Sequence, residues 1–141
     1  MAAPTHMDTA RITHHGELRT EVLHVRSGQR FLTDAPVDNQ GRGEAISPTD
    51  MLAASLAACM LTTMDIKAQA NGLALRNMGA SVVKHMATDP RRVRKVEVRI
   101  ELDGEGLSAA DRQLLERAAH ACPVAMSLHP DLEQETTITY R

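Results

Sequence analysis

Two cysteines, Cys59 and Cys122, are the residues of this chain whose type and spacing are best suited to chemistry. Each lies in one of the two segments with the strongest helical pattern. One thiol could attack an electrophile, and the other could then resolve the product as a disulfide. A pair of one attacking and one resolving thiol is typical of thiol peroxidases, and it is the most specific chemistry that the sequence predicts.

The segment that must position Cys59 is predicted to be a helix from Pro48 to about Ala70. Ser47 is a good N-cap, Pro48 suits the first helical position, and Asp50 completes a capping box with Ser47. The Asn71-Gly72 pair favours the left-handed backbone that ends a helix.

The first four turns of this helix are apolar on every face, and small residues allow another backbone to approach closely. Such a helix must be covered all round, which a domain of 141 residues rarely achieves by itself. We therefore expect an oligomer, most simply a homodimer, that buries part of this helix.

Cys122 precedes Pro123, which is predicted to begin a short helical piece. Backbone N–H groups at such a position favour a thiolate, so we expect the pKa of Cys122 to be lowered. The alternative is that Cys122 only ends the longer helix that begins at the capping box of Ser108 and Asp111. Likewise, Cys59 could be a small apolar core residue, as many buried helical cysteines are.

Most of the remaining secondary structure is predicted to be β-strand. They are expected within residues 10–32 with a turn at Ser27-Gly28-Gln29, at about 74–85, at 93–102, and at 136–140. The order of strands, helix, strands, helix and strand predicts an α+β fold with a mainly antiparallel sheet and a long buried central helix. We expect one domain over residues 1–141, with residues 1–8 as a loose tail.

Composition argues against several classes of function. The net charge is −2, and one Phe and one Tyr are the only aromatic residues, so nucleic-acid binding is not expected. The uncharged run from Met51 to Met64 is shorter than the roughly 20 residues of a membrane span. No signal peptide, metal-ligand spacing or phosphate-binding loop is visible, so we expect a cytoplasmic protein without metal or cofactor.

Several segments resemble the OsmC/Ohr family of osmotically inducible and organic-hydroperoxide-resistance proteins. They are residues 43–52, which end in Ser47-Pro48-Thr49-Asp50-Met51-Leu52, then Ala57-Ala58-Cys59 and Cys122-Pro123-Val124. Residues 33–38 and 84–93 resemble the OsmC-like branch in particular. The resemblance extends from about Gly16 to Tyr140.

This resemblance implies an intertwined homodimer whose cysteine helices lie at the interface, and it implies reduction of organic hydroperoxides. Cys59 would be the attacking thiolate and Cys122 the resolving thiol. Arg19 is the best match for an activating arginine, and Asp50 matches the acid that orients it in the OsmC-like branch, whereas Thr49 stands where the Ohr branch has a glutamate. The expected reductant is an external dithiol of the lipoyl type.

The residues are also compatible with a different class of function. Eight Met residues suit a soft apolar pocket, so the chain could be a non-catalytic dimeric binder of an apolar small molecule with structural cysteines.

Overall fold

The computed structural model describes residues 6–141. Most of the predicted N-terminal tail, residues 1–5, lies outside the described residues. The chain divides into two compact units, one ending at Met51 and the other spanning Leu52–Arg141. The expectation of one domain stays a prediction.

The first unit is a three-stranded antiparallel meander. Its strands are β1 (Ala10–Gly16), β2 (Arg19–His24) and β3 (Arg30–Asp34), in the order β1-β2-β3. The turn between β1 and β2 places Glu17 and Leu18 at positive φ, 53° and 62°, which is the backbone of a tight two-residue hairpin. A short 3-10 helix, η1 (Val37–Asn39), follows β3.

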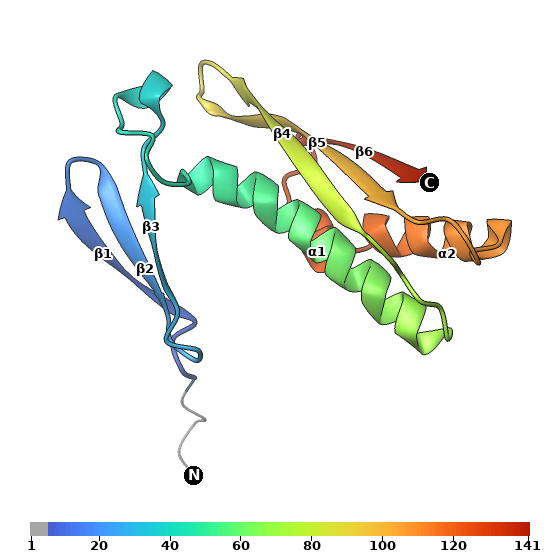
Figure 1. Ribbon diagram of the computed structural model, residues 1–141. Helices are drawn as coiled ribbons and strands as arrows, with labels where there is room; N and C mark the ends of the chain where they lie inside the picture. The colour runs from blue at the N-terminus through green and yellow to red at the C-terminus, as the bar shows by residue number, and fades with distance from the viewer. Residues whose placement is uncertain (1–5) are drawn as a thin grey trace, which may run out of the picture. The chain divides into compact units, whose positions relative to one another are not determined.

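The second unit contains a second three-stranded sheet and the helices that pack with it (Figure 1). Its elements are α1 (Pro48–Ala70, which begins in the first unit), β4 (Gly79–Ala87), β5 (Arg92–Leu102), α2 (Ala109–His120), α3 (Pro123–Ser127) and β6 (Glu133–Tyr140). Strands β4 and β5 form the expected antiparallel pair, whereas β5 and β6 are parallel. A parallel pair needs a long crossover, which α2 and α3 supply here.

The core of the second unit lies between the inner face of its sheet and one stripe of α1. From Val96 to Leu102, strand β5 alternates between buried and less buried positions, so its apolar side chains share one face. These side chains and the α1 stripe belong to one cluster that includes Val96, Val98, Ile100, Leu102, Leu56, Met60, Met64 and Cys122. Because Cys122 is part of this cluster, the core itself fixes one of the two thiols.

Both predicted capping boxes are present. At the start of α1, the Asp50 N–H donates to Ser47 Oγ at 3.0 Å, and the Ser47 N–H donates to Asp50 Oδ2 at 3.1 Å. Ser108 and Asp111 make the same reciprocal pair at the start of α2. These bonds satisfy N–H groups that a helix start leaves without partners, so both starts lie where the local sequence predicts them.

The face of α1 opposite the core is exposed in the single chain. Ser55, Ala58, Thr62 and Ile66 are all exposed, with Ile66 63% accessible. By length and composition alone α1 is apolar enough to cross a membrane, as core helices of soluble proteins also can be. The helix thus follows one buried stripe rather than being covered all round.

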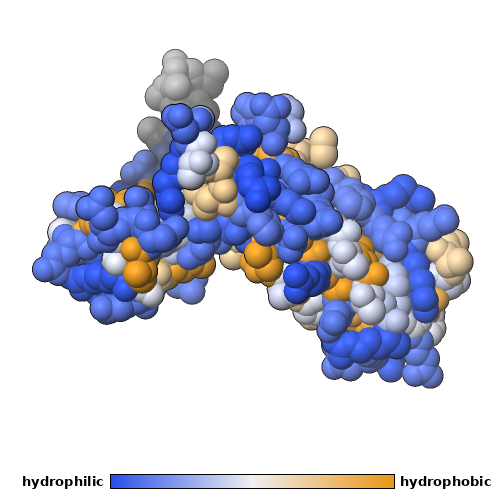
Figure 2. Space-filling model, turned by 90° about the horizontal axis from the view of Figure 1, so that it is seen from above, coloured by the Kyte–Doolittle hydropathy of each residue, from blue (hydrophilic) through white to orange (hydrophobic). Residues whose placement is uncertain are grey.

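The α+β prediction is confirmed by these two sheets and the helices between the strands. Two expected bounds shift, since β4 begins at Gly79 and β6 begins at Glu133. One face of the chain is mainly hydrophilic, with apolar residues in small separate patches (Figure 2).

Candidate active site

Cys59 lies on α1 at the edge of the core, where its side chain is half-buried. Its sulfur accepts a hydrogen bond from the backbone N–H of Val124, with 3.5 Å between nitrogen and sulfur. An N–H donor directed at a sulfur stabilises negative charge there. Cys59 therefore combines partial access with a fixed electrostatic partner.

Cys122 is the N-cap of α3 and is completely buried. Its sulfur accepts the backbone N–H of Ala125 at 3.4 Å. Pro123 takes the first helical position, where its missing N–H costs nothing. The prediction that a short helix begins at Pro123 is confirmed.

The fold brings the two thiols together. Both cysteines are free thiols, and Cys59 lies near enough to Cys122 to raise the pKa of its thiol. The two N–H donors belong to consecutive residues, Val124 and Ala125, so the first turn of α3 serves both sulfurs. This arrangement holds both sulfurs at one turn of the chain.

The expected lowering of the Cys122 pKa is wrong. Burial raises the pKa of the Cys122 thiol, and the neighbouring Cys59 raises it further, whereas the N–H groups of Ala125 and Val124 act in the opposite direction. The loss of water around a fully buried sulfur outweighs two backbone donors. Cys122 is therefore held as a neutral thiol at neutral pH.

Arg19 lies on β2 of the first unit, where a carboxylate holds its guanidinium. Its Nε and Nη2 groups donate to the two carboxylate oxygens of Asp34 at 2.7 and 2.8 Å. This bidentate pair fixes the plane of the guanidinium, which a single contact would not. Glu44 approaches the same group at 3.6 Å but is largely exposed.

The Arg19–Asp34 pair perturbs both partners. The hydrogen bonds from Arg19 hold the pKa of the Asp34 carboxyl below its usual range, although burial opposes this. The same bonds raise the pKa of Arg19. Asp34 is completely buried, while the Arg19 side chain is 20% exposed. Asp34 therefore fixes the orientation of the guanidinium, and part of the Arg19 side chain stays accessible to solvent.

Sequence reasoning missed Asp34. The signal that could have found it is the register of a short hairpin, because Arg19 and Asp34 are directly opposite each other on β2 and β3. Opposite charges at such cross-strand positions attract.

Asp50 caps α1 through Ser47, as described above. Its pairing with Arg19, which the resemblance implies, stays a prediction, because the described bonds place Asp34 at the guanidinium fork. Arg19 and Asp50 belong to the first unit, whereas both cysteines belong to the second.

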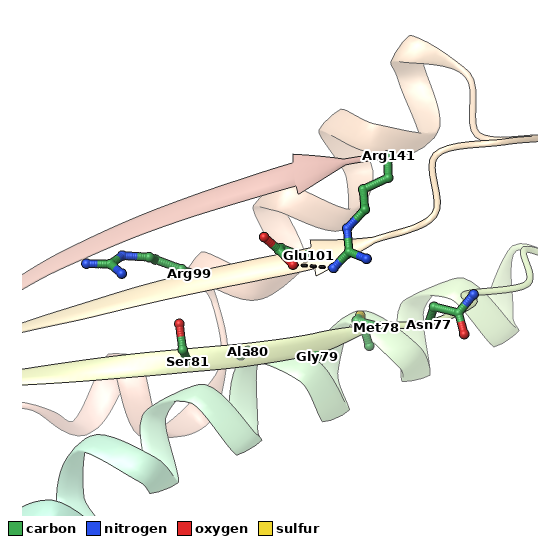
Figure 3. Close-up of a pocket in the computed structure, with 8 residues that line it drawn as sticks. All are labelled: Asn77, Met78, Gly79, Ala80, Ser81, Arg99, Glu101 and Arg141. Carbon is green, nitrogen blue, oxygen red and sulfur yellow. Dashed lines mark hydrogen bonds and ion pairs between the residues drawn. The ribbon is translucent and has the colours of Figure 1, made fainter.

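A pocket of about 460 Å³ lies on the second sheet, away from the core face (Figure 3). Arg99 and Glu101 line it, and they alternate along β5 with the buried Val98 and Ile100. Neither cysteine lines this pocket, and its cations are already paired, Arg141 with Glu101 and Arg99 with Glu97. Within residues 6–141, no group of three or more His, Cys, Asp or Glu side chains could hold a metal ion.

Comparison with known proteins places the chain in a family. The family model described as OsmC-like protein matches residues 41–137. A solved structure from Psychrobacter arcticus 273-4, for which a role as an osmotic stress induced and detoxification response protein has been proposed, is 44% identical with a TM-score of 0.89. The match covers 97% of this chain and 99% of that one.

Two more distant structures share the fold. An organic hydroperoxide resistance protein OsmC from Legionella pneumophila is 19% identical, with a TM-score of 0.71 over 96% of this chain and 99% of that one. An organic hydroperoxide resistance protein from Elizabethkingia anophelis is 15% identical, with a TM-score of 0.75 over 98% of this chain and 100% of that one. No match was found among curated proteins.

Proposed function

The chain belongs to the OsmC-like protein family, and on this premise we propose that it reduces organic hydroperoxides with the thiol pair Cys59 and Cys122. The observation that carries the proposal is that two consecutive N–H groups of α3 donate to the sulfurs of Cys59 and Cys122, which are distant in sequence. The names of the Legionella and Elizabethkingia proteins, which share the fold, support hydroperoxide as the class of substrate.

In the first step, the Cys59 thiolate attacks the distal oxygen of R–OOH and breaks the O–O bond. The sulfur loses two electrons and becomes a sulfenic acid, and R–O⁻ leaves and takes up the proton that the thiol released on ionisation, which gives the alcohol R–OH. Cys59 suits this role better than Cys122, because Cys59 is half-buried and Cys122 is fully buried. The N–H of Val124 stabilises negative charge on the attacking sulfur.

In the second step, the sulfur of Cys122 attacks the sulfenic sulfur of Cys59. An S–S bond forms, the S–O bond breaks, and water leaves with the proton of the Cys122 thiol. Burial, which raises the pKa of Cys122, keeps that proton in place until the sulfenic acid has formed. The neutral thiol also does not compete with Cys59 for peroxide, since the thiolate is the nucleophile.

In the third step, an external dithiol reduces the disulfide. It gives two electrons and two protons, so that both cysteines return to thiols and the reductant becomes a cyclic disulfide. We propose a lipoyl-type dithiol for this role, in a reducing compartment such as the cytoplasm. An apolar reductant suits the apolar residues around Cys59.

The surroundings of Cys59 also favour organic hydroperoxides over hydrogen peroxide. Cys59 and Val124 pack against the core cluster that contains Leu56 and Met60. An apolar R group gains from leaving water for such a surface, whereas hydrogen peroxide gains nothing.

A cation beside the attacking sulfur and a homodimer complete the proposal. We propose Arg19 as the cation, because its charge is permanent and Asp34 fixes its orientation. We propose a homodimer because the α1 face with Ala58 and Ile66 is exposed in the single chain.

The proposal is tested by peroxide consumption with dihydrolipoamide as the reductant. Cumene hydroperoxide should be consumed at least tenfold faster than hydrogen peroxide, and Cys59→Ser should abolish turnover. A folded Cys59→Ser variant with wild-type turnover contradicts the proposal. The alternative, a binder of apolar molecules with inert cysteines, predicts no consumption by any variant.

A further inference from the structure

Gln134 is a polar residue on the inner side of β6. The strand alternates between exposed and half-buried positions, and Gln134 shares the half-buried side with Thr136, Ile138 and Tyr140. The side-chain amide of Gln134 donates from Nε2 to the carbonyl oxygen of Ala125 at 2.9 Å. The last carbonyls of a helix have no partner within it, so Gln134 satisfies one such group of the short helix α3.

Ala125, whose carbonyl accepts this bond from Gln134, belongs to the first turn of α3, and N–H groups of that turn donate to both sulfurs. The N–H of Ala125 donates to Cys122 Sγ, and the N–H of its neighbour Val124 donates to Cys59 Sγ. A helix of five residues has little stability of its own. Its position therefore depends on tertiary contacts, of which the Gln134 bond is one.

Strand β6 also contacts the segment that carries the other cysteine. Thr136 Oγ1 lies 3.9 Å from Met60 Sδ, and Met60 is the buried neighbour of Cys59 on α1. Gln134 and Thr136 are two residues apart on one side of the strand, so β6 reaches both cysteine-bearing segments.

The strand itself is fixed by the sheet. Gln134 pairs with Val96 and Thr136 pairs with Val98 in the parallel ladder between β5 and β6. Both partners on β5 are buried core residues, with 0% and 1% exposure. The two polar contacts thus start from a part of the fold that has little freedom to shift.

We propose that Gln134 is a positioning residue that holds α3 so that Cys122 faces Cys59. This inference rests on the proposed function, in which the two thiols form a disulfide. Without the bond to Ala125, α3 gains freedom in the dithiol form, and disulfide formation must then remove that freedom. The disulfide becomes less favourable, although no reacting atom has changed.

The test is the equilibrium between the protein dithiol and oxidised dithiothreitol. Two electrons and two protons pass from Cys59 and Cys122 to the reagent, and no peroxide is involved. Gln134→Met keeps the length of the side chain but removes the donor, and Gln134→Glu keeps its shape and removes the N–H. Ile138→Val is the matched control, because it shortens an apolar side chain on the same side of the same strand.

Both Gln134 variants should lower the equilibrium constant for disulfide formation by ~fivefold, the value of one hydrogen bond. Ile138→Val should lower the melting temperature but leave this equilibrium within ~1.5-fold of wild type. Agreement of the Gln134 variants with wild type overturns the positioning role, and so does an equal shift in Ile138→Val. A wild-type protein that forms no disulfide overturns the proposed function as well. Failure of the positioning role alone is therefore distinguished from failure of the proposed function.

Discussion

The half-buried sulfur of Cys59 and the buried sulfur of Cys122 lie at the same turn of α3, whose consecutive N–H groups donate to them. This turn pairs one sulfur that reagents can approach with one that the core shields. Different roles for the two cysteines follow from this difference in exposure. In the proposed cycle, the more exposed sulfur attacks and the shielded one resolves.

Removal of the resolving thiol should stop the cycle after its first step. In Cys122→Ser, one equivalent of cumene hydroperoxide should convert Cys59 to a sulfenic acid that dimedone traps, at about one adduct per chain. Catalytic turnover with a dithiol should fall at least tenfold, because the intramolecular disulfide cannot form. Trapping of an equal amount of adduct in Cys59→Ser would place the sulfenic acid on the wrong cysteine.

The titration of Cys122 should occur above the range of an ordinary thiol. Burial is the largest cause of the raised pKa, and it persists when Cys59 is replaced. In Cys59→Ser, the ultraviolet absorbance of the single thiolate should therefore rise at higher pH than in a glycine-flanked cysteine peptide. A midpoint at or below that of the peptide would contradict the assignment of Cys122 as a neutral thiol.

The Arg19–Asp34 pair should make stability depend on pH in the acid range. Because the folded pKa of Asp34 lies below its usual range, its charge stabilises the fold above the unfolded pKa, and this contribution is lost as pH falls through the folded pKa. Urea unfolding should show Asp34→Asn less stable than wild type at neutral pH, with the difference shrinking below about pH 4.

An exposed pair on the same hairpin supplies the control for that experiment. Arg30 donates to Glu21 at 2.8 Å, and the Arg30 side chain is 59% exposed. Glu21→Gln should change the free energy of unfolding by less than about 1 kcal/mol. A difference between wild type and Asp34→Asn that persists unchanged into acid would show that the ion pair is not its cause.

The exposed face of α1 should be the contact between two copies of the chain. Ala58 is exposed beside Cys59, and a long cation at this position would be incompatible with close approach of another helix. Light scattering should give a dimer for wild type and a folded monomer for Ala58→Arg. Thr137→Arg, on the exposed side of β6, should stay dimeric. A monomeric wild type would remove this part of the proposal.

The parts of the fold that local sequence determines were predictable. The reciprocal bonds of Ser47 with Asp50 and of Ser108 with Asp111 depend on residues three positions apart, so both helix starts could be located. Cys122 before Pro123 gave the start of α3 for the same reason. The alternation of β5 likewise identified its buried face.

The remaining features depend on contacts between distant residues. The buried Asp34 becomes a partner of Arg19 through strand register, and Gln134 reaches Ala125 only because β6 returns parallel to β5. The pKa of Cys122 depends on how completely the core covers the sulfur, and the local N–H donors alone point in the opposite direction. The Arg19–Asp34 pair follows only once the register of the hairpin is known, and the Gln134 contact and the burial of Cys122 do not follow from residue spacing at all.

The most direct measurement is the intact mass of the chain after one equivalent of cumene hydroperoxide, followed by peptide mapping without reduction. We expect the loss of two hydrogens per chain and a peptide pair joined through Cys59 and Cys122, both reversed by a dithiol. An unchanged mass, or oxygen added with both thiols still free to alkylate, would contradict this expectation.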